Sequence, residues 1–404
     1  MNIKLDIIMS LVILFLIIIY KIYQFKRYKL IYVGNLYKRS NGICKVLLSL
    51  SILIGIGSLL FFYINNNLNI KNVLFSISLL VCVLPINLFN MYRMFFLDEE
   101  KYSHIKTVIT NKIPDKELFK KYLKAGINIV IFSKEKLKYK IDKVSIKDIN
   151  RRTLKKCCIV NSEDIKVVNK YLIDDEIIIN NDLDKLYDNI YHARGVHDNY
   201  IRSIKYIFVL YFSIVVSNIV FIVGKFPACT NISFILLFKL LSLLCIEFIF
   251  KDLKYDIDIM DRKVKDSNII VGKQECLLLF MISMLILFAI SIPYMFIIVQ
   301  SDNIGLVRGL YYVILIYCML FFNYYNYSEK IYIINIINSF KSIRMIIYLV
   351  CSIVLSILIS KIKYLYVSDM VLKNYFSCIL ISLIICILFD VFKFSRWLSN
   401  RRKR

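Results

Sequence analysis

Glycine and proline are scarce in this chain, which has ten glycines and four prolines among its 404 residues. No stretch is rich in either residue, so the sequence shows no flexible or extended linker of the kind that separates domains. Histidine is scarcer still, with three residues, His104, His192 and His197. His192 and His197 are five positions apart, which does not place them on one helix face. We therefore expect no metal site.

Paired cysteine motifs and nucleotide-binding motifs are also lacking. The eleven cysteines are scattered, mostly within apolar runs, and none forms a CxxC pair. Cys157 and Cys158 are adjacent, and we interpret them as packing residues rather than as metal ligands or disulfide partners. The chain has neither GxGxxG nor GxxxxGK[ST]. We expect no cofactor and no bound nucleotide.

Apolar residues are abundant, at 59% of the chain with a mean hydropathy of +0.64. This exceeds what a soluble protein of this length contains. A helix needs about 20 apolar residues to cross a bilayer. The sequence therefore predicts a polytopic α-helical membrane protein, and we interpret the first run as a retained anchor rather than a signal peptide. The expected spans are 5–23, 44–64, 72–95, 203–224, 231–250, 275–299, 309–327, 344–363 and 375–394.

Basic residues outnumber acidic ones, 54 to 29, for a net charge of +25. They cluster beside the apolar runs, in "KIYQFKRYK" after the first run and in "SRWLSNRRKR" at the end of the sequence. Short basic flanks stay in the cytoplasm, so we expect an external N-terminus, a cytoplasmic C-terminus and a cell-membrane location. Nucleic acid is the other partner that such a charge suggests, but the chain has no nucleic-acid-binding motif. Anionic lipid of the bilayer is the favoured partner.

The apolar runs divide the chain into three expected parts: three spans in 1–96, one polar block in 97–200 and six spans in 201–404. The polar block alternates strand-like and helix-like segments. Four are apolar and β-branched, as buried parallel strands are, namely "HIKTVIT", "AGINIVIFS", "KKCCIV" and "DEIIIN". "DKELFKKYLK" (115–124) has helical spacing, and the stretch from Asp182 reads as one long helix that continues into the membrane.

Several segments resemble the P-type cation-transporting ATPases. "LDKLYDNIYHARGVHDNYIRSIKY" (183–206) resembles the stretch that links the family's phosphorylation domain to its fifth membrane helix. "LLVCVLPINL" (79–88) resembles the fourth membrane helix with its proline kink, and "YDIDIMDRKVKDSNII" (255–270) resembles the loop after the sixth. The resemblance covers most of 72–404. It implies family helices two to ten around a small cytoplasmic α/β remnant of a HAD-like phosphorylation domain, with no room for the nucleotide-binding domain.

The same resemblance implies that the phosphoryl-transfer chemistry is lost. In "VITNKIP", Asn111 falls on the family's phosphorylated aspartate and Lys112 on the lysine that follows it. An amide has no anionic oxygen with which to attack a γ-phosphate. The family's "TGD" and magnesium-binding motifs fall on Ser133, Lys134, Glu135 and Asp164. Because three parts of the machinery are altered together, we expect a pseudoenzyme.

The ion pathway that the resemblance implies has lost its carboxylates as well. Ile86 and Asn87 follow Pro85 where the family has a glutamate. Family ligand positions in the next two helices fall on Tyr211, Ile214, Lys239 and Ser242. Carboxylates that bind a transported cation are therefore absent from these positions.

We interpret the run "ISFILLFKLLSLLCIEFIF" as apolar apart from Lys239. One interpretation is that its long side chain snorkels to the membrane surface. The other is a tethered cation: Pro85 lacks a backbone donor and leaves a carbonyl free near Val81, and the three donors of Lys239 satisfy such carbonyls permanently.

A non-catalytic regulator or subunit of a membrane transport complex, with a membrane-protein partner, is the function that these features favour. A cation transporter that works without ATP or is driven by a partner is the alternative, and an ATPase that takes its nucleotide from elsewhere is a third.

Overall fold

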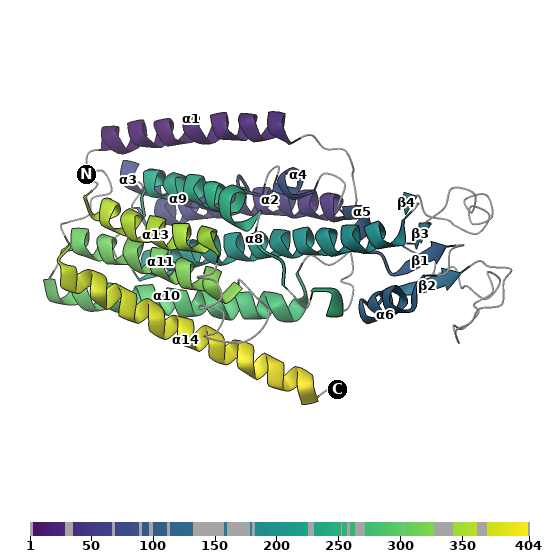
Figure 1. The fold of residues 1–404 in the computed structure, drawn as a ribbon. Helices are drawn as coiled ribbons and strands as arrows, with labels where there is room; N and C mark the ends of the chain where they lie inside the picture. The colour runs from purple at the N-terminus through teal and green to yellow at the C-terminus, as the bar shows by residue number, and fades with distance from the viewer. Residues whose placement is uncertain are drawn as a thin grey trace.

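The structure is a computed structural model of the 404-residue chain. It describes residues 3–28, 35–66, 69–88, 91–96, 100–110, 114–131, 157–159, 178–179, 182–224, 230–251, 253–256, 259–262, 271–301, 303–326, 342–361 and 370–402. Within these residues the chain is a bundle of long helices with a small sheet at one end (Figure 1). All eight cysteines whose side chains are described are free thiols.

Long apolar helices make up the bundle. Seven helices in the described part of the chain are long and apolar enough to cross a membrane, and two shorter apolar helices, 72–83 and 343–359, accompany them. The predicted class of helical membrane protein is thus confirmed, with seven clear spans where nine were expected. The helices are α1 (Ile3–Arg27), α2 (Asn35–Ile64), α3 (Ile70–Val83), α8 (Leu183–Val223), α9 (Ile232–Cys245), α10 (Lys273–Ser301), α11 (Ile304–Asn326), α13 (Ile343–Lys361) and α14 (Leu372–Arg402).

The expected single span over 72–95 is wrong, because the chain breaks there. Helix α3 ends at Val83, a turn follows through Pro85, and the short helix α4 (Met91–Phe95) resumes beyond it. Proline has no N–H and its ring clashes with the preceding turn, which favours a break at residue 85. The break leaves backbone carbonyls inside the bundle.

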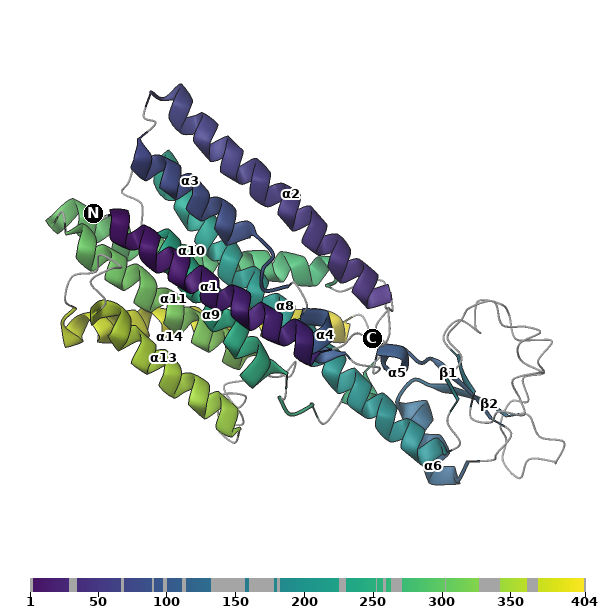
Figure 2. The same ribbon diagram turned by 90° about the horizontal axis from the view of Figure 1, so that it is seen from above.

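Helix α11 forms the centre of the bundle, and α1 and α2 lie at its edge. Nearly every described side chain of α11 from Leu310 to Tyr324 is buried, against α10, α13 and α14. Helix α2 packs on the shorter α3, and α1 packs on α9 (Figure 2). Both outer helices keep many large apolar side chains exposed, which suits helices surrounded by lipid.

The polar block contains the four expected strands, and their predicted parallel arrangement is confirmed. Strands β1 (Thr107–Thr110), β2 (Asn128–Ile131), β3 (Cys157–Ile159) and β4 (Ile178–Ile179) form a sheet in the order β2-β1-β3-β4. Helix α6 (Lys116–Lys124) crosses from β1 to β2, as its sequence predicted. Gly126 ends that crossover with φ +68°, a conformation that glycine adopts without steric cost.

Helix α8 joins the sheet to the bundle. Its 41 residues begin after Asp182, whose side chain accepts the Asp184 N–H, and they run from the sheet into the apolar core. The predicted continuous helix is therefore confirmed. At the sheet end, the Tyr122 hydroxyl donates to the Leu183 carbonyl at 2.6 Å. The sheet is anchored to the start of the same helix that forms part of the membrane core.

Short helix α5 (Glu100–Ser103) and the segment after α9 brace α8 where it leaves the bundle. Asp256 of this segment accepts Arg202 at 3.0 Å, and Arg262 contacts Asp198 at 2.9 Å. Gly195 allows the close approach, because a Cβ there would lie 2.3 Å from the Tyr255 ring. Residues that the sequence placed in one loop are thus ion-paired to one face of α8.

Candidate functional site

The break at Pro85 exposes two backbone carbonyls to the interior of the bundle. In a continuous helix the Ile86 N–H would bond to the Cys82 carbonyl, but here it bonds to the Leu84 carbonyl at 2.8 Å. The Cys82 carbonyl therefore has no helical partner. The Leu84 carbonyl points into the same turn and keeps a second lone pair.

Lys239 of α9 supplies the donors for these carbonyls. Its side chain is 0% exposed, and Nζ donates to the Cys82 oxygen at 3.0 Å and to the Leu84 oxygen at 2.8 Å. Nζ also lies 4.0 Å from the centre of the Tyr211 ring, a distance at which an aromatic face attracts a cation. The ammonium is thus held inside the bundle, as the tethered-cation interpretation expects and the snorkelling interpretation does not.

Three neutral side chains form a hydrogen-bonded cluster beside the ammonium. Asn87 Nδ2 donates to the Tyr211 hydroxyl at 2.8 Å and to Ser242 Oγ, and the two hydroxyls are 2.9 Å apart. Ser242 Oγ in turn donates to the Lys239 carbonyl at 2.9 Å. We call Asn87, Tyr211, Lys239 and Ser242, from the α3 break, α8 and α9, the proline-break cluster.

One polar atom of the proline-break cluster is unsatisfied. Asn87 Oδ1 is buried and has no hydrogen-bond partner among the described residues. The Tyr211 and Ser242 hydroxyls can accept from the amide nitrogen or donate to the amide oxygen, so their bonds allow either amide orientation, and in the orientation described here the unbonded atom is the oxygen. The cluster therefore offers one spare acceptor and contains no carboxylate.

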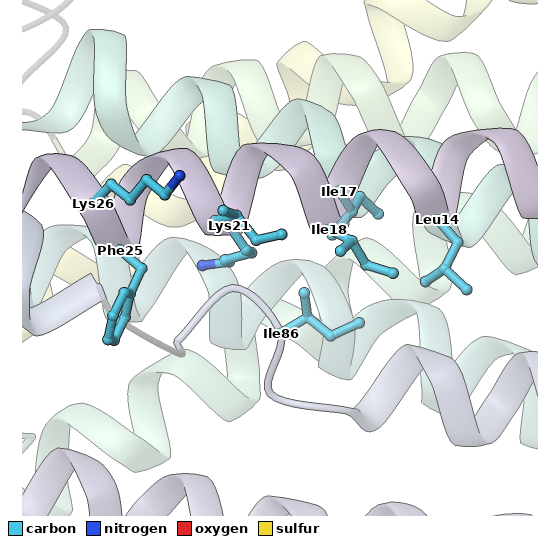
Figure 3. Close-up of a pocket in the computed structure, with 8 residues that line it drawn as sticks. Leu14, Ile17, Ile18, Lys21, Phe25, Lys26 and Ile86 are labelled. Carbon is cyan, nitrogen blue, oxygen red and sulfur yellow. The ribbon is translucent and has the colours of Figure 1, made fainter.

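Of the residues predicted for the ion pathway, four meet at this cluster and two face elsewhere. Pro85 supplies the break itself. Ile214 is fully buried in the apolar core, and its carbonyl accepts Asn218 Nδ2 at 2.7 Å. Ile86 lines a groove beside α1 (Figure 3). The resemblance thus identified positions that gather around the break, although their chemistry is a lysine ammonium and neutral groups.

The positions tied to phosphoryl transfer lie outside the described residues, so they stay predictions: Asn111, Lys112, Ser133, Lys134, Glu135 and Asp164. The strands that precede two of these motifs are described. Thr110 pairs with Ile131 at the carboxyl ends of the parallel strands β1 and β2. In open α/β sheets the chain beyond this edge forms the ligand-binding loops.

Sequence reasoning missed a second buried charge on the same element, Glu247. Helix α9 continues into η3 (Ile246–Phe250), a π-helical turn of the kind that often marks functional sites. Glu247 is 5% exposed and accepts Tyr20, Gln24 at 3.0 Å and Tyr28 at 3.0 Å, while Arg27 lies 3.4 Å away. The signal was a lone acidic residue in the run "LLCIEFIF".

No protein-family model and no curated protein matches this chain.

Proposed function

We propose that the chain is a non-catalytic membrane protein with the membrane fold of the P-type cation-transporting ATPases, acting as a regulator or subunit of a membrane transport complex. The supporting observation is the position of the Lys239 ammonium. It donates hydrogen bonds to two backbone carbonyls at a proline break. In the P-type ATPases, which this chain resembles, carbonyls at such a position help to coordinate the transported ion. A cation that is covalently part of the chain cannot be released across the membrane.

The polar block is consistent with lost catalysis. A four-stranded parallel sheet is present, and the residue that follows β1 is Asn111 rather than an acid. Without a carboxylate nucleophile the acyl-phosphate route is closed. We expect no phosphoenzyme when the purified protein is incubated with γ-labelled ATP and Mg²⁺ and then quenched in acid. Asn111→Asp alone should not restore labelling, because Lys134 is still present and the nucleotide-binding domain is still absent. A hydroxylamine-sensitive labelled band in the parent protein would contradict the pseudoenzyme.

The role as a subunit is tested by purification and reconstitution. The tagged chain, cross-linked in its native membrane and isolated, should bring a membrane protein with it at constant stoichiometry. The isolated chain in liposomes should carry no K⁺, Na⁺ or Ca²⁺ flux above empty vesicles. Flux by the chain alone, with no protein co-purifying, would overturn the proposal.

The alternative, a cation transporter without ATP hydrolysis, is favoured by the spare acceptor of Asn87. A cation that entered the proline-break cluster would find this oxygen and, if Lys239 swung away, the two carbonyls. The same flux measurement separates the two functions. A transporter must move a cation across the liposome membrane by itself, whereas a subunit without transport activity produces no flux.

A further inference from the structure

An open groove lies between α1 and the loop after Pro85. Its volume is about 410 Å³, and it is lined by Leu14, Ile17, Ile18, Lys21, Ile22, Phe25, Lys26 and Ile86. Figure 3 shows Leu14 and Ile18 at one end of the groove and the two lysines at the other. Apart from the lysines, every lining side chain is apolar.

The apolar part of the groove is suited to an acyl chain. Leu14, Ile18 and Ile22 are spaced four residues apart on one face of α1, and their side chains are 36%, 47% and 51% exposed. In a membrane-spanning helix such side chains meet hydrocarbon rather than water. A groove beside them holds a chain more closely than a flat helix surface does.

The other end of the groove is positively charged. Lys21 and Lys26 line it, and the Arg93 guanidinium lies 4.6 Å from the centre of the Phe25 ring beside them. The acidic side chain that faces α1 near this end, Glu247, accepts hydrogen bonds from Tyr20, Gln24 and Tyr28. Three basic side chains thus adjoin an apolar groove near the end of a membrane helix.

We propose that this groove binds one anionic phospholipid. An acyl chain lies along Leu14, Ile18 and Ile22, and the phosphate lies at the end of the groove that Lys21 and Lys26 line. Charge complementarity selects an anionic headgroup, since basic pockets between membrane helices bind such lipids and each lysine near the surface contributes about 1 kcal/mol. This site is separate from the proposed subunit role and does not depend on it.

The test uses the full chain in nanodiscs that mix phosphatidylcholine and phosphatidylglycerol, with retained lipid measured by native mass spectrometry after extraction. The parent should retain phosphatidylglycerol in preference to phosphatidylcholine. Lys21→Gln and Lys26→Gln should each lower that preference about fivefold. Ile18→Trp, which fills the apolar end, should displace the lipid although both lysines remain.

The matched controls are Lys38→Gln and Lys45→Gln, two exposed lysines on α2 that do not line the groove. They make the same charge change and should keep the parent's preference. Glycerol 3-phosphate should not compete, because the proposed ligand is a lipid held by both ends. Equal retention of the two lipids by the parent would overturn the proposal, whatever the variants do. So would competition by glycerol 3-phosphate, or loss of preference in the α2 controls.

Discussion

The bundle contains two buried charges that lie eight residues apart and have different kinds of partner. One is Lys239 on α9, and the other is Glu247 on the π-helical turn that continues α9. The ammonium is held by main-chain carbonyls of a broken helix and by an aromatic face. The carboxylate is held by side chains of α1 and of the residue that follows it, namely the hydroxyls of Tyr20 and Tyr28 and the amide of Gln24. One charge repairs a backbone defect, and the other fastens α1 to the bundle.

The difference decides what each site tolerates. Carbonyls freed by Pro85 stay where the backbone places them, so they need a donor of the right size at a fixed point. The side chains that surround Glu247 can change rotamer, so they can adjust to a substitution there. A buried polar group without a partner costs more than a hydrogen bond contributes. We therefore expect Lys239 to be the more sensitive of the two positions.

The largest effect is expected for Lys239→Met, which keeps the bulk of the side chain and removes its charge and donors. The Cys82 carbonyl then loses its partner, at about 1–3 kcal/mol for a buried unsatisfied group, whereas the Leu84 carbonyl keeps its bond from the Ile86 N–H. Loss of a buried charge offsets part of this cost. The thermal unfolding midpoint in detergent should fall, and added K⁺ or Na⁺ should restore it by binding in the vacated position.

The control for this variant is Lys45→Met, an exposed lysine of α2, which should unfold like the parent and ignore added cations. Lys239→Arg should be destabilised despite its charge, because a planar guanidinium fork needs more room than a compact ammonium. If Lys239→Met unfolds like the parent with or without cations, the ammonium does not satisfy the carbonyls and the tethered-cation interpretation is wrong.

Sequence reasoning located the break cluster because each of its signals is local. Pro85 interrupts an apolar run, and Lys239 is a lone charge in another; the rule that a buried charge needs a partner joins them. What the sequence did not show is which carbonyls are used. That depends on how the turn closes after the break, with the Ile86 N–H bonded to the Leu84 carbonyl and the Cys82 carbonyl left over.

Glu247 was not predicted, because the side chains that it faces depend on how α9 is rotated and aligned against α1. An acid near the end of an apolar run reads as a residue at the membrane surface. Only the π-helical turn and the packing of α1 on α9 show that it faces Tyr20, Gln24 and Tyr28. The strands of the polar block were predictable for the opposite reason, since short apolar β-branched runs between polar segments identify parallel strands without reference to their neighbours.

A smaller effect is expected for Glu247→Gln, which keeps an acceptor oxygen and removes the charge. Hydrogen bonds to a charged group are worth about 1 kcal/mol more than neutral ones, so the free energy of unfolding should fall by about that amount. In a double-mutant cycle with Tyr20→Phe, the two effects should be coupled, because the hydroxyl and the carboxylate share one bond.

The control cycle pairs Glu247→Gln with Ser217→Ala, which loses the bond to the Tyr311 hydroxyl between α8 and α11. These two sites share no partner, so their effects should add. If the effects of Glu247→Gln and Tyr20→Phe are also additive, the carboxylate does not fasten α1 to the bundle. The contrast drawn between Lys239 and Glu247 would then be wrong for Glu247.

The smallest change in stability is expected for Asn87→Leu. Leucine has the same branched arrangement of side-chain non-hydrogen atoms as asparagine but is larger, and it removes an acceptor, Oδ1, that is buried without a partner among the described residues. The Tyr211 and Ser242 hydroxyls remain 2.9 Å apart and keep their bond to each other. Polar contacts between membrane helices average about 0.6 kcal/mol, so losing the two donated by Asn87 costs little once its unsatisfied oxygen is also gone. The variant should therefore unfold within about 1 kcal/mol of the parent, and added cations should leave its midpoint unchanged.

If the chain is instead a transporter that uses this oxygen, the parent in liposomes conducts a cation and Asn87→Leu abolishes the flux while leaving the fold intact. Suppose that the parent shows no flux and that Asn87→Leu folds normally. The only cation of the proline-break cluster is then the Lys239 ammonium, and the neutral residues serve only to enclose it.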